Sequence, residues 1–323
     1  MNSALVAGSF ELTRLLFVGG GLLALIYKRK VGVTPGGIIL PGLLAIMLYN
    51  NVLAVGLTLL LAVICWLIAE HTIYRFVLDS RMATLLVMVL SIALTLGCRA
   101  IFGLDLLHFT TVELAIPTFI IPGLFASTAH KYGLLRTGFG MLLVSAAVYL
   151  VAILLAQIIP ISLLTQSSSE LAHYLRFSLK NVYIVLPISL VLETVLVYFF
   201  RVRAGGYAVM PMFASYIVTA PIQGLMLLGS IALTFLVVWL VLKTTKVVGL
   251  ERFVCCLFMG FICVSAMDMI ASATTVPNYM TAAITPIIII AVVANDLLID
   301  PVKNLSLGVA PAALAASVVR WFV

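Results

Sequence analysis

Two stretches of eight residues, IILPGLLA at 38–45 and FIIPGLFA at 119–126, repeat one pattern in which a Pro-Gly pair interrupts apolar sequence. Proline removes a helix hydrogen bond and glycine weakens a helix, so both residues oppose a continuous helix. In a bilayer, interrupted helices are tolerated only where protein or water satisfies the freed backbone groups. We therefore expect both stretches to interrupt membrane helices beside a buried site.

Composition places the chain among polytopic membrane proteins. Hydrophobic residues make up 64% of the chain, charged residues only 9%, and the mean hydropathy is +1.28, which is far from the soluble range. The five cysteines and four histidines lack the spacing of a metal site, so we expect no metal and no other cofactor. The net charge of +7 suits an anionic lipid or an anionic substrate.

Hydrophobic segments of two lengths alternate along the chain. Eight of them reach the length of about 20 residues that a span requires: 9–27, 49–69, 82–98, 137–160, 182–200, 222–242, 253–273 and 304–322. Four shorter segments lie near 33–48, 114–129, 206–220 and 277–294, and centre on Pro41, Pro122, Pro211 and Pro286. The short segments either re-enter the same side, which gives eight spans, or cross, which gives twelve.

The distribution of basic residues favours twelve crossings. With Lys28, Arg29 and Lys30 cytoplasmic and Arg14 left out as part of a span, the re-entrant arrangement puts nine basic residues inside and eight outside. The crossing arrangement puts thirteen inside and four outside, as the positive-inside rule requires. We therefore predict an all-α membrane protein with about 12 crossings, made of eight long helices and four short segments broken by proline.

A long span, a short proline segment and a second long span together form one unit of three crossings. Because three is odd, successive units are inverted. Each half has six crossings, so the two halves are parallel. The predicted domains are a first membrane repeat at 1–160, a polar linker at 161–181 and a diverged second repeat at 182–323. Inverted pairs with interrupted helices are typical of secondary transporters. Met212 and Ile287 follow the prolines of the second repeat where Gly42 and Gly123 follow those of the first, so we place the site in the first repeat.

The first repeat contains five short motifs: the basic turn and Gly-x-x-Pro-Gly-Gly run at 28–37, Pro-Gly at 41–42, Tyr74-Arg75-Phe76, Pro-Gly-Leu at 122–124 and His130-Lys131-Tyr132-Gly133. With these motifs the chain resembles, over residues from about 9 to 155, the PgsC/CapC family, the membrane subunit of bacterial poly-γ-glutamate synthase. Family members are about half this length. The chain thus looks like a tandem duplication or fusion whose second half has drifted.

The resemblance implies a multi-pass subunit of the bacterial cytoplasmic (inner) membrane that takes part in capsule synthesis and polymer export. Its implied partners are a cytoplasmic ATP-dependent amide ligase, possibly a further membrane-anchored subunit, the anionic polymer and membrane lipids, with no nucleic acid. The sequence contains no Gly-x-x-x-x-Gly-Lys-Ser/Thr loop. We therefore expect a non-catalytic subunit, and assign nucleotide chemistry to the ligase.

Candidate binding residues lie in the interrupted segments and in the basic turns beside them. We assign polymer binding to Gly36, Gly37, Pro41, Gly42, Pro122, Gly123, Lys28, Arg29, Lys30, His130, Lys131, Arg201 and Arg203. Backbone N–H groups at helix breaks suit carboxylates. Glu193 and Asp268, acidic residues within predicted spans, are candidates for a cation or proton site, for pairing with a distant arginine, or for a position nearer the interface.

Two other functions fit the same sequence. An autonomous secondary transporter of a small organic anion could use the inverted architecture, and uptake by the purified chain in liposomes would identify it. A membrane-embedded transferase acting on a lipid-linked substrate would need convergent acid and base residues, which the sequence does not reveal. We assign no catalytic residue.

Overall fold

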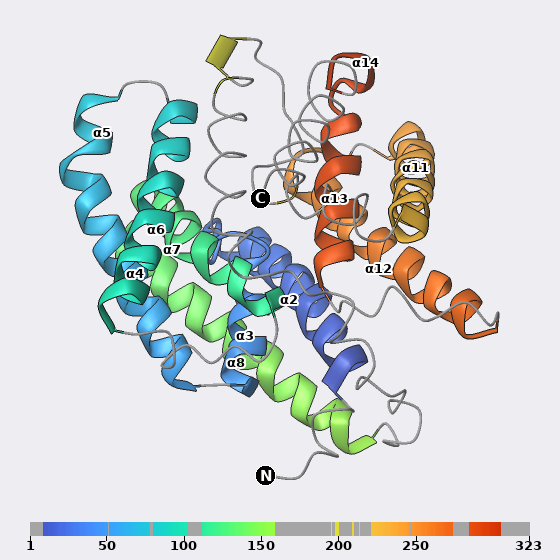
Figure 1. Cartoon of the computed structure of the whole chain (residues 1–323), viewed down its shortest axis with the longest axis horizontal. Coiled ribbons are helices and arrows are strands. Elements are labelled where there is room, and N and C mark those ends of the chain that lie inside the picture. The colour runs from blue at the N-terminus through green and yellow to red at the C-terminus, as the bar shows by residue number, and fades with distance from the viewer. Residues whose placement is uncertain are drawn as a thin grey trace. The chain divides into compact units, whose positions relative to one another are not determined.

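The computed structural model describes residues 9–50, 52–77, 80–102, 112–158, 221–245, 247–273 and 284–304, together with Val195, Tyr198, Phe199, Val209 and Phe213 (Figure 1). The described residues form helices and their connections, with no strand among them, which confirms the all-helical prediction. The chain divides into two compact units, Met1–Ser167 and Ser168–Val323. The predicted linker at 161–181 lies outside the described residues.

The first unit contains seven helices in its described ranges. They are α2 (Ser9–Val31), α3 (Leu40–Asn50), α4 (Val52–His71), α5 (Ile73–Phe76), α6 (Ser80–Phe102), α7 (Val112–Tyr132) and α8 (Leu134–Ile158). Helix α2 packs on α3, and α6 packs on α7. Helices α2, α3 and α4 form one group, and α6, α7 and α8 form another. The two groups contact each other, because α8 packs on α3 and α4 packs on α7.

The described part of the second unit centres on three mutually packed helices, α11 (Pro221–Thr244), α12 (Leu250–Ala273) and α13 (Thr285–Leu297). A short helix, α14 (Pro301–Asn304), follows α13 and contacts it. Gly260 of α12 lies against α13, because a Cβ there would be 3.3 Å from Cγ2 of Ile290. A small residue at this position lets the two helices approach closely, as in other membrane bundles.

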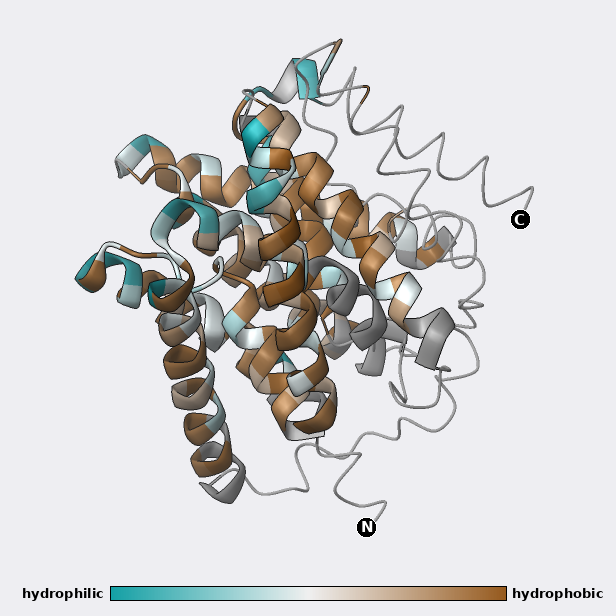
Figure 2. Ribbon diagram, turned by 90° about the vertical axis from the view of Figure 1, so that its left-hand side faces the viewer, coloured by the Kyte–Doolittle hydropathy of each residue, from teal (hydrophilic) through white to brown (hydrophobic). Residues whose placement is uncertain are grey.

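Four described helical stretches are long and apolar enough to cross a membrane: Val52–Phe76, Leu134–Val151, Gly224–Thr244 and Leu250–Met267. Figure 2 shows hydrophobic colour along most of the helices, with hydrophilic colour gathered near helix ends and turns. Exposed large apolar side chains such as Leu225, Leu150 and Leu60 suit contact with lipid. The described part therefore has the composition and dimensions of a membrane protein.

Pro41 stands at the start of a helix. Helix α2 continues to Val31, residues 32–39 are not helical, and α3 then begins at Leu40 with Pro41 as its second residue. Proline is tolerated in the first turn because the N–H that it lacks would have no partner inside the helix. Pro286 has the same place in α13, and Pro211 lies outside the described residues.

Pro122 corrects the prediction of a break at the second Pro-Gly pair. It lies inside α7, which runs without interruption from Val112 to Tyr132. Proline in a helix interior removes one hydrogen bond, but neighbouring side chains can satisfy the freed backbone groups in a packed bundle. The segment predicted as short and broken is thus one helix of 21 residues.

Candidate functional site

Helices α2 and α3 touch through two glycines. A Cβ at Gly20 would lie 2.3 Å from Cα of Gly42, and a Cβ at Gly42 would lie 2.7 Å from the carbonyl oxygen of Phe17. Both distances are too short for a side chain, so the backbones themselves are in contact. Gly42, predicted to bind polymer, therefore has a packing function.

This contact fixes the depth at which α3 begins. Gly20 lies eleven residues before the end of α2 at Val31, which corresponds to about 16 Å along the helix. That distance is roughly half of a hydrocarbon core about 30 Å thick. Residues 32–39 thus lead from the end of α2 back to its middle, where α3 starts.

The connection between α2 and α3 depends on glycines in the left-handed region. Gly32, Gly36 and Gly37 have φ angles of +80°, +72° and +114°, which residues with a Cβ rarely adopt. A Cβ at Gly36 would also lie 3.0 Å from Cδ2 of Leu40 and 3.1 Å from Sδ of Met141 in α8. The predicted site residues Gly36 and Gly37 therefore shape the connection between α2 and α3, and Gly36 packs closely against α3 and α8.

The backbone beside Pro122 is already hydrogen bonded. Gly123 N–H donates to Oγ of Ser91 in α6 at 3.0 Å. A Cβ at Gly123 would lie 2.6 Å from Sδ of Met88, so α6 and α7 also approach closely here. The N–H predicted to meet a carboxylate thus has a partner within the protein, and a direct role of Gly123 in binding stays a prediction.

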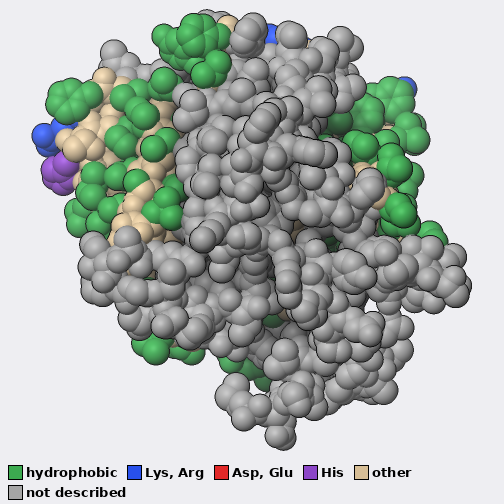
Figure 3. Space-filling model, in the orientation of Figure 1, with side chains coloured by type: hydrophobic (Ala, Val, Ile, Leu, Met, Phe, Trp, Pro, Cys, Tyr) green, Lys and Arg blue, Asp and Glu red, His purple; other side chains and the backbone are tan. Residues whose placement is uncertain are grey.

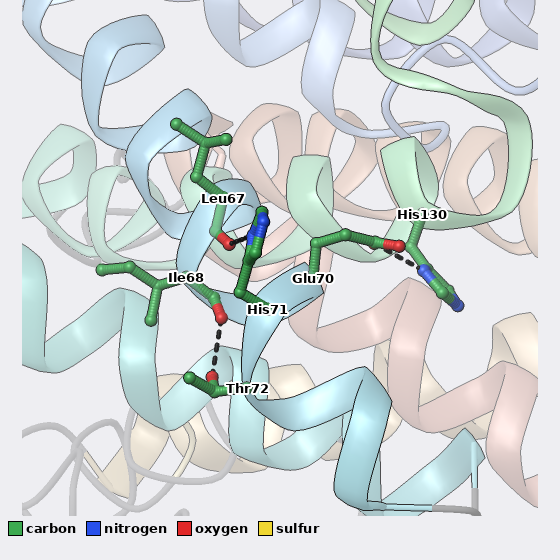
Figure 4. Close-up of polar contacts among 6 residues, drawn as sticks. All are labelled: Leu67, Ile68, Glu70, His71, Thr72 and His130. Carbon is green, nitrogen blue, oxygen red and sulfur yellow. Dashed lines mark hydrogen bonds and ion pairs between the residues drawn. The ribbon is translucent and has the colours of Figure 1, made fainter.

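A polar cluster joins the ends of α4 and α7. Nδ1 of His130 lies 2.7 Å from Oε2 of Glu70 (Figure 4). The His130 ring also stacks on Tyr74, with ring centroids 3.7 Å apart. More than a third of the side-chain surface of His130 and of Glu70 is exposed. In the same view His71 and Thr72 bond instead to carbonyl oxygens of their own helix.

Basic side chains gather at the same end of the unit. Gly140 of α8 packs against the ring of Tyr27 in α2, so the last turn of α2 and the start of α8 lie together. We call this region the basic end, and it comprises Lys28, Arg29, Lys30, Glu70, Tyr74, Arg75, His130, Lys131 and Arg136. Figure 3 shows Lys or Arg and His side chains beside hydrophobic ones, at the edge where Figure 1 places α5.

Sequence reasoning missed Glu70 and Ser91. Glu70 lies four residues before Tyr74, at the end of a long apolar span. An acidic residue at this position was a signal, but only basic residues were counted in assigning the two sides of the membrane. Ser91 lies inside α6, where a serine reads as a packing residue. Only the fold brings these residues to His130 and to Gly123.

The remaining predicted residues are not placed. Arg201, Arg203 and Glu193 lie outside the described residues. Asp268 belongs to α12, but its side chain is not described. Among the described residues, no group of three His, Cys, Asp or Glu side chains could hold a metal ion.

Comparison with known protein families gives two matches along the chain. Residues 20–138 and residues 188–305 each match the family described as Capsule biosynthesis CapC. The first match contains all five motifs that carry the resemblance. Together the two matches cover more than half of the chain.

Individual relatives agree with this result. The chain is 29% identical over 131 residues to the PGA biosynthesis protein CapC of Bacillus subtilis (strain 168), which covers 40% of this chain and 86% of the relative. It is 26% identical over 134 residues to the Capsule biosynthesis protein CapC of Bacillus anthracis, with the same coverage. No solved structure matches. The chain therefore belongs to the capsule biosynthesis CapC family.

Proposed function

We propose that this protein is a non-catalytic membrane subunit of a complex that makes and exports poly-γ-glutamate or a similar anionic poly-amino-acid. A cytoplasmic ATP-dependent amide ligase makes the polymer, and this subunit anchors the ligase or conducts the polymer across the bacterial cytoplasmic membrane. The single observation that carries the proposal is the double match to the CapC family, whose Bacillus subtilis relative is a PGA biosynthesis protein.

The contact between Glu70 and His130 supports twelve crossings. The eight-span arrangement puts residues 70–76 and residues 130–136 on opposite sides of the membrane. The two side chains nevertheless lie 2.7 Å apart, which requires one side for both. The crossing arrangement predicts this, because it puts both segments on the cytoplasmic side with Lys28, Arg29 and Lys30.

The path of residues 32–50 supports a crossing at the first Pro-Gly pair. Residues 32–39 reach the middle of α2, and the 11 residues of α3 add about 16 Å in the same direction. Helix α4 then returns to the basic end with Glu70. A half-extended, half-helical segment can cross here because α2 and α8 cover it on either side.

Helix packing supports an inverted pair of three-segment units in the first half. In both units the glycine after the proline packs on the preceding helix, Gly42 on α2 and Gly123 on α6. Helix α3 of the first three-segment unit contacts α8 of the second, and α7 of the second contacts α4 of the first. A pseudo-two-fold axis requires such matching contacts. The second half, with its own family match, is the parallel copy in this proposal.

The basic end gives the subunit a place to receive a polyanion. Arg29, Lys30 and Lys131 are exposed, and together with Lys28 they form a cationic mouth that concentrates carboxylates, with the predicted binding residue His130 beside them. Arg201 and Arg203 are the proposed counterparts in the second half, and Glu193 and Asp268 are proposed ion or proton ligands. Gly36, Gly37 and the start of α3 at Pro41 lie deeper, on the proposed polymer path.

Gene deletion tests this function directly. Deleting the gene in a polymer-producing strain should abolish surface polymer, because the ligase then lacks its membrane partner. A plasmid copy of the gene should restore the polymer. An amide ligase should co-purify with this subunit from strains that make the polymer. A deletion strain with undiminished polymer would reject the proposal, and uptake of small organic anions by the purified chain in liposomes would favour the autonomous transporter.

A further inference from the structure

The connection between α2 and α3 contains backbone donors that no described residue satisfies. Gly36 N–H donates to the carbonyl oxygen of Thr34 at 2.9 Å. The following N–H groups donate to no residue that the structure describes, although their residues are buried: Val33, Thr34, Ile38 and Leu40. Buried backbone donors are nearly always paired, so the acceptors of these groups lie outside the described residues, and a bound molecule is one source of them.

Helix α8 presents two unpaired hydroxyls to the same region. Oγ1 of Thr137 and Oγ of Ser145 are buried and make no hydrogen bond within the described part of the chain, and their residues are 0% and 1% exposed. They flank Met141, whose Sδ lies 3.1 Å from where a Cβ of Gly36 would be. At four-residue spacing the three side chains fall within an arc of about 80° on α8.

Other threonines of this unit show that an unpaired hydroxyl is avoidable. Thr58, Thr95 and Thr128 donate to carbonyl oxygens of their own helices at 2.7 Å, 2.8 Å and 2.8 Å. This local bond is the usual solution for a hydroxyl inside a membrane helix. Thr137 and Ser145 do not make it, so their hydroxyls remain available on the face that packs toward the 32–39 segment.

We propose that Thr137, Ser145 and the backbone N–H groups of Val33, Thr34, Ile38 and Leu40 form one binding seam for the carboxylate oxygens of the polymer. This inference rests on the proposed function, and it adds that α8 forms one side of the polymer-binding site. The seam offers N–H and O–H donors without a lysine or arginine among its members. Such a donor set suits an anionic oxygen, and its neutrality lets a polyanion move on instead of being held.

Isosteric removal of the hydroxyls tests the seam. Thr137→Val and Ser145→Ala, alone and together, are compared with Thr58→Val, which removes a hydroxyl that bonds within α4. The readouts are surface polymer in a deletion strain carrying each variant, and affinity of the purified chain for a γ-linked glutamate oligomer. A hydrogen bond to a charged group is worth about tenfold or more in affinity, so the double variant should bind at least about tenfold more weakly.

Folding and chemistry need their own controls. Removing an unpaired buried hydroxyl does not destabilise a protein, so both variants should keep the wild-type thermal midpoint, and Thr137→Ser should restore binding to Thr137→Val. A γ-linked glutamate oligomer whose α-carboxylates are converted to amides should bind much more weakly than the unmodified oligomer. Equal binding of the two oligomers would reject a carboxylate site.

The outcomes separate the seam from the function. If the deletion strain keeps its polymer, the proposed function fails, and the seam fails with it. If deletion abolishes the polymer but the stable double variant makes wild-type amounts and binds the oligomer normally, the function stands. In that case the two hydroxyls contact water only and the seam is rejected.

Discussion

Tyr74 and His130 stack with ring planes 3° from parallel, although 56 positions separate them in the sequence. Each residue belongs to a motif that carries the family resemblance, and the fold brings the two motifs together at the basic end. Glu70 completes the cluster through its hydrogen bond to His130. Helices α4 and α7 thus meet through polar side chains at the basic end.

Breaking this cluster should cost little stability. Because Glu70 and His130 are both more than a third exposed, their coupling should be about 0.2–1 kcal/mol. A double-mutant cycle with Glu70→Gln and His130→Ala, followed by thermal unfolding in detergent, measures it. A coupling of several kcal/mol would mean that the pair is buried in the assembled protein, contrary to the exposed mouth described above.

Gly20→Ala should be strongly destabilising. The new Cβ would meet backbone atoms of Gly42, which cannot move aside as a side chain can, so we expect a loss of about 3 kcal/mol. Gly19→Ala is the matched control, because nothing lies within 4 Å of its Cβ, and better helix propensity should make it neutral or stabilising. Equal midpoints for the two variants would contradict the contact between α2 and α3.

Ser91→Ala should destabilise α7 against α6. It leaves the buried Gly123 N–H without its acceptor, which costs about 1–3 kcal/mol. Ser127→Ala serves as the control, because the Ser127 hydroxyl bonds only to a carbonyl oxygen of its own helix, and we expect a change below about 0.5 kcal/mol. If both variants unfold alike, Ser91 does not satisfy the backbone beside Pro122.

Charge removal at the basic end should reduce polymer without affecting folding. Lys28→Gln, Arg29→Gln and Lys30→Gln combined with Lys131→Gln remove four cations from the mouth, and we expect surface polymer to fall at least about fivefold. Lys243→Gln is a matched control, since Lys243 also ends an apolar helix but lies over the ring of Trp239. Undiminished polymer in the fourfold variant, at normal protein level, would reject the cationic mouth.

The class of the fold could be read from the sequence, because lipid contact dictates apolar composition and the described chain is helical as expected. The placement of Pro41 beside a non-helical connection also follows from local chemistry, since proline and glycine act within one turn. Pro122 could not be predicted in this way. Beside it, Gly123 N–H donates to Ser91 of another helix, and such a contact has no local signature.

The candidate site was predictable in its motifs and not in its contacts. Gly36, Gly37 and the basic residues drew attention through spacing and charge. Gly42 and Gly123 were predicted to mark helix breaks, and the structure shows that both glycines allow helices to approach closely, while their role in binding stays a prediction. Thr137 and Ser145 carry no pattern of their own, and Glu70 stands out only as an acidic residue at the end of an apolar span; only the packing shows which side chains lie beside them.

The most direct test of the account is the side of the membrane on which residues 75 and 131 lie. Single cysteines replacing Arg75 and Lys131, both exposed, are placed in a chain whose five native cysteines are replaced, and an impermeant thiol reagent is applied to intact cells and to inside-out vesicles. The account predicts that both cysteines react only in inside-out vesicles. Reaction of one cysteine from each side would contradict it.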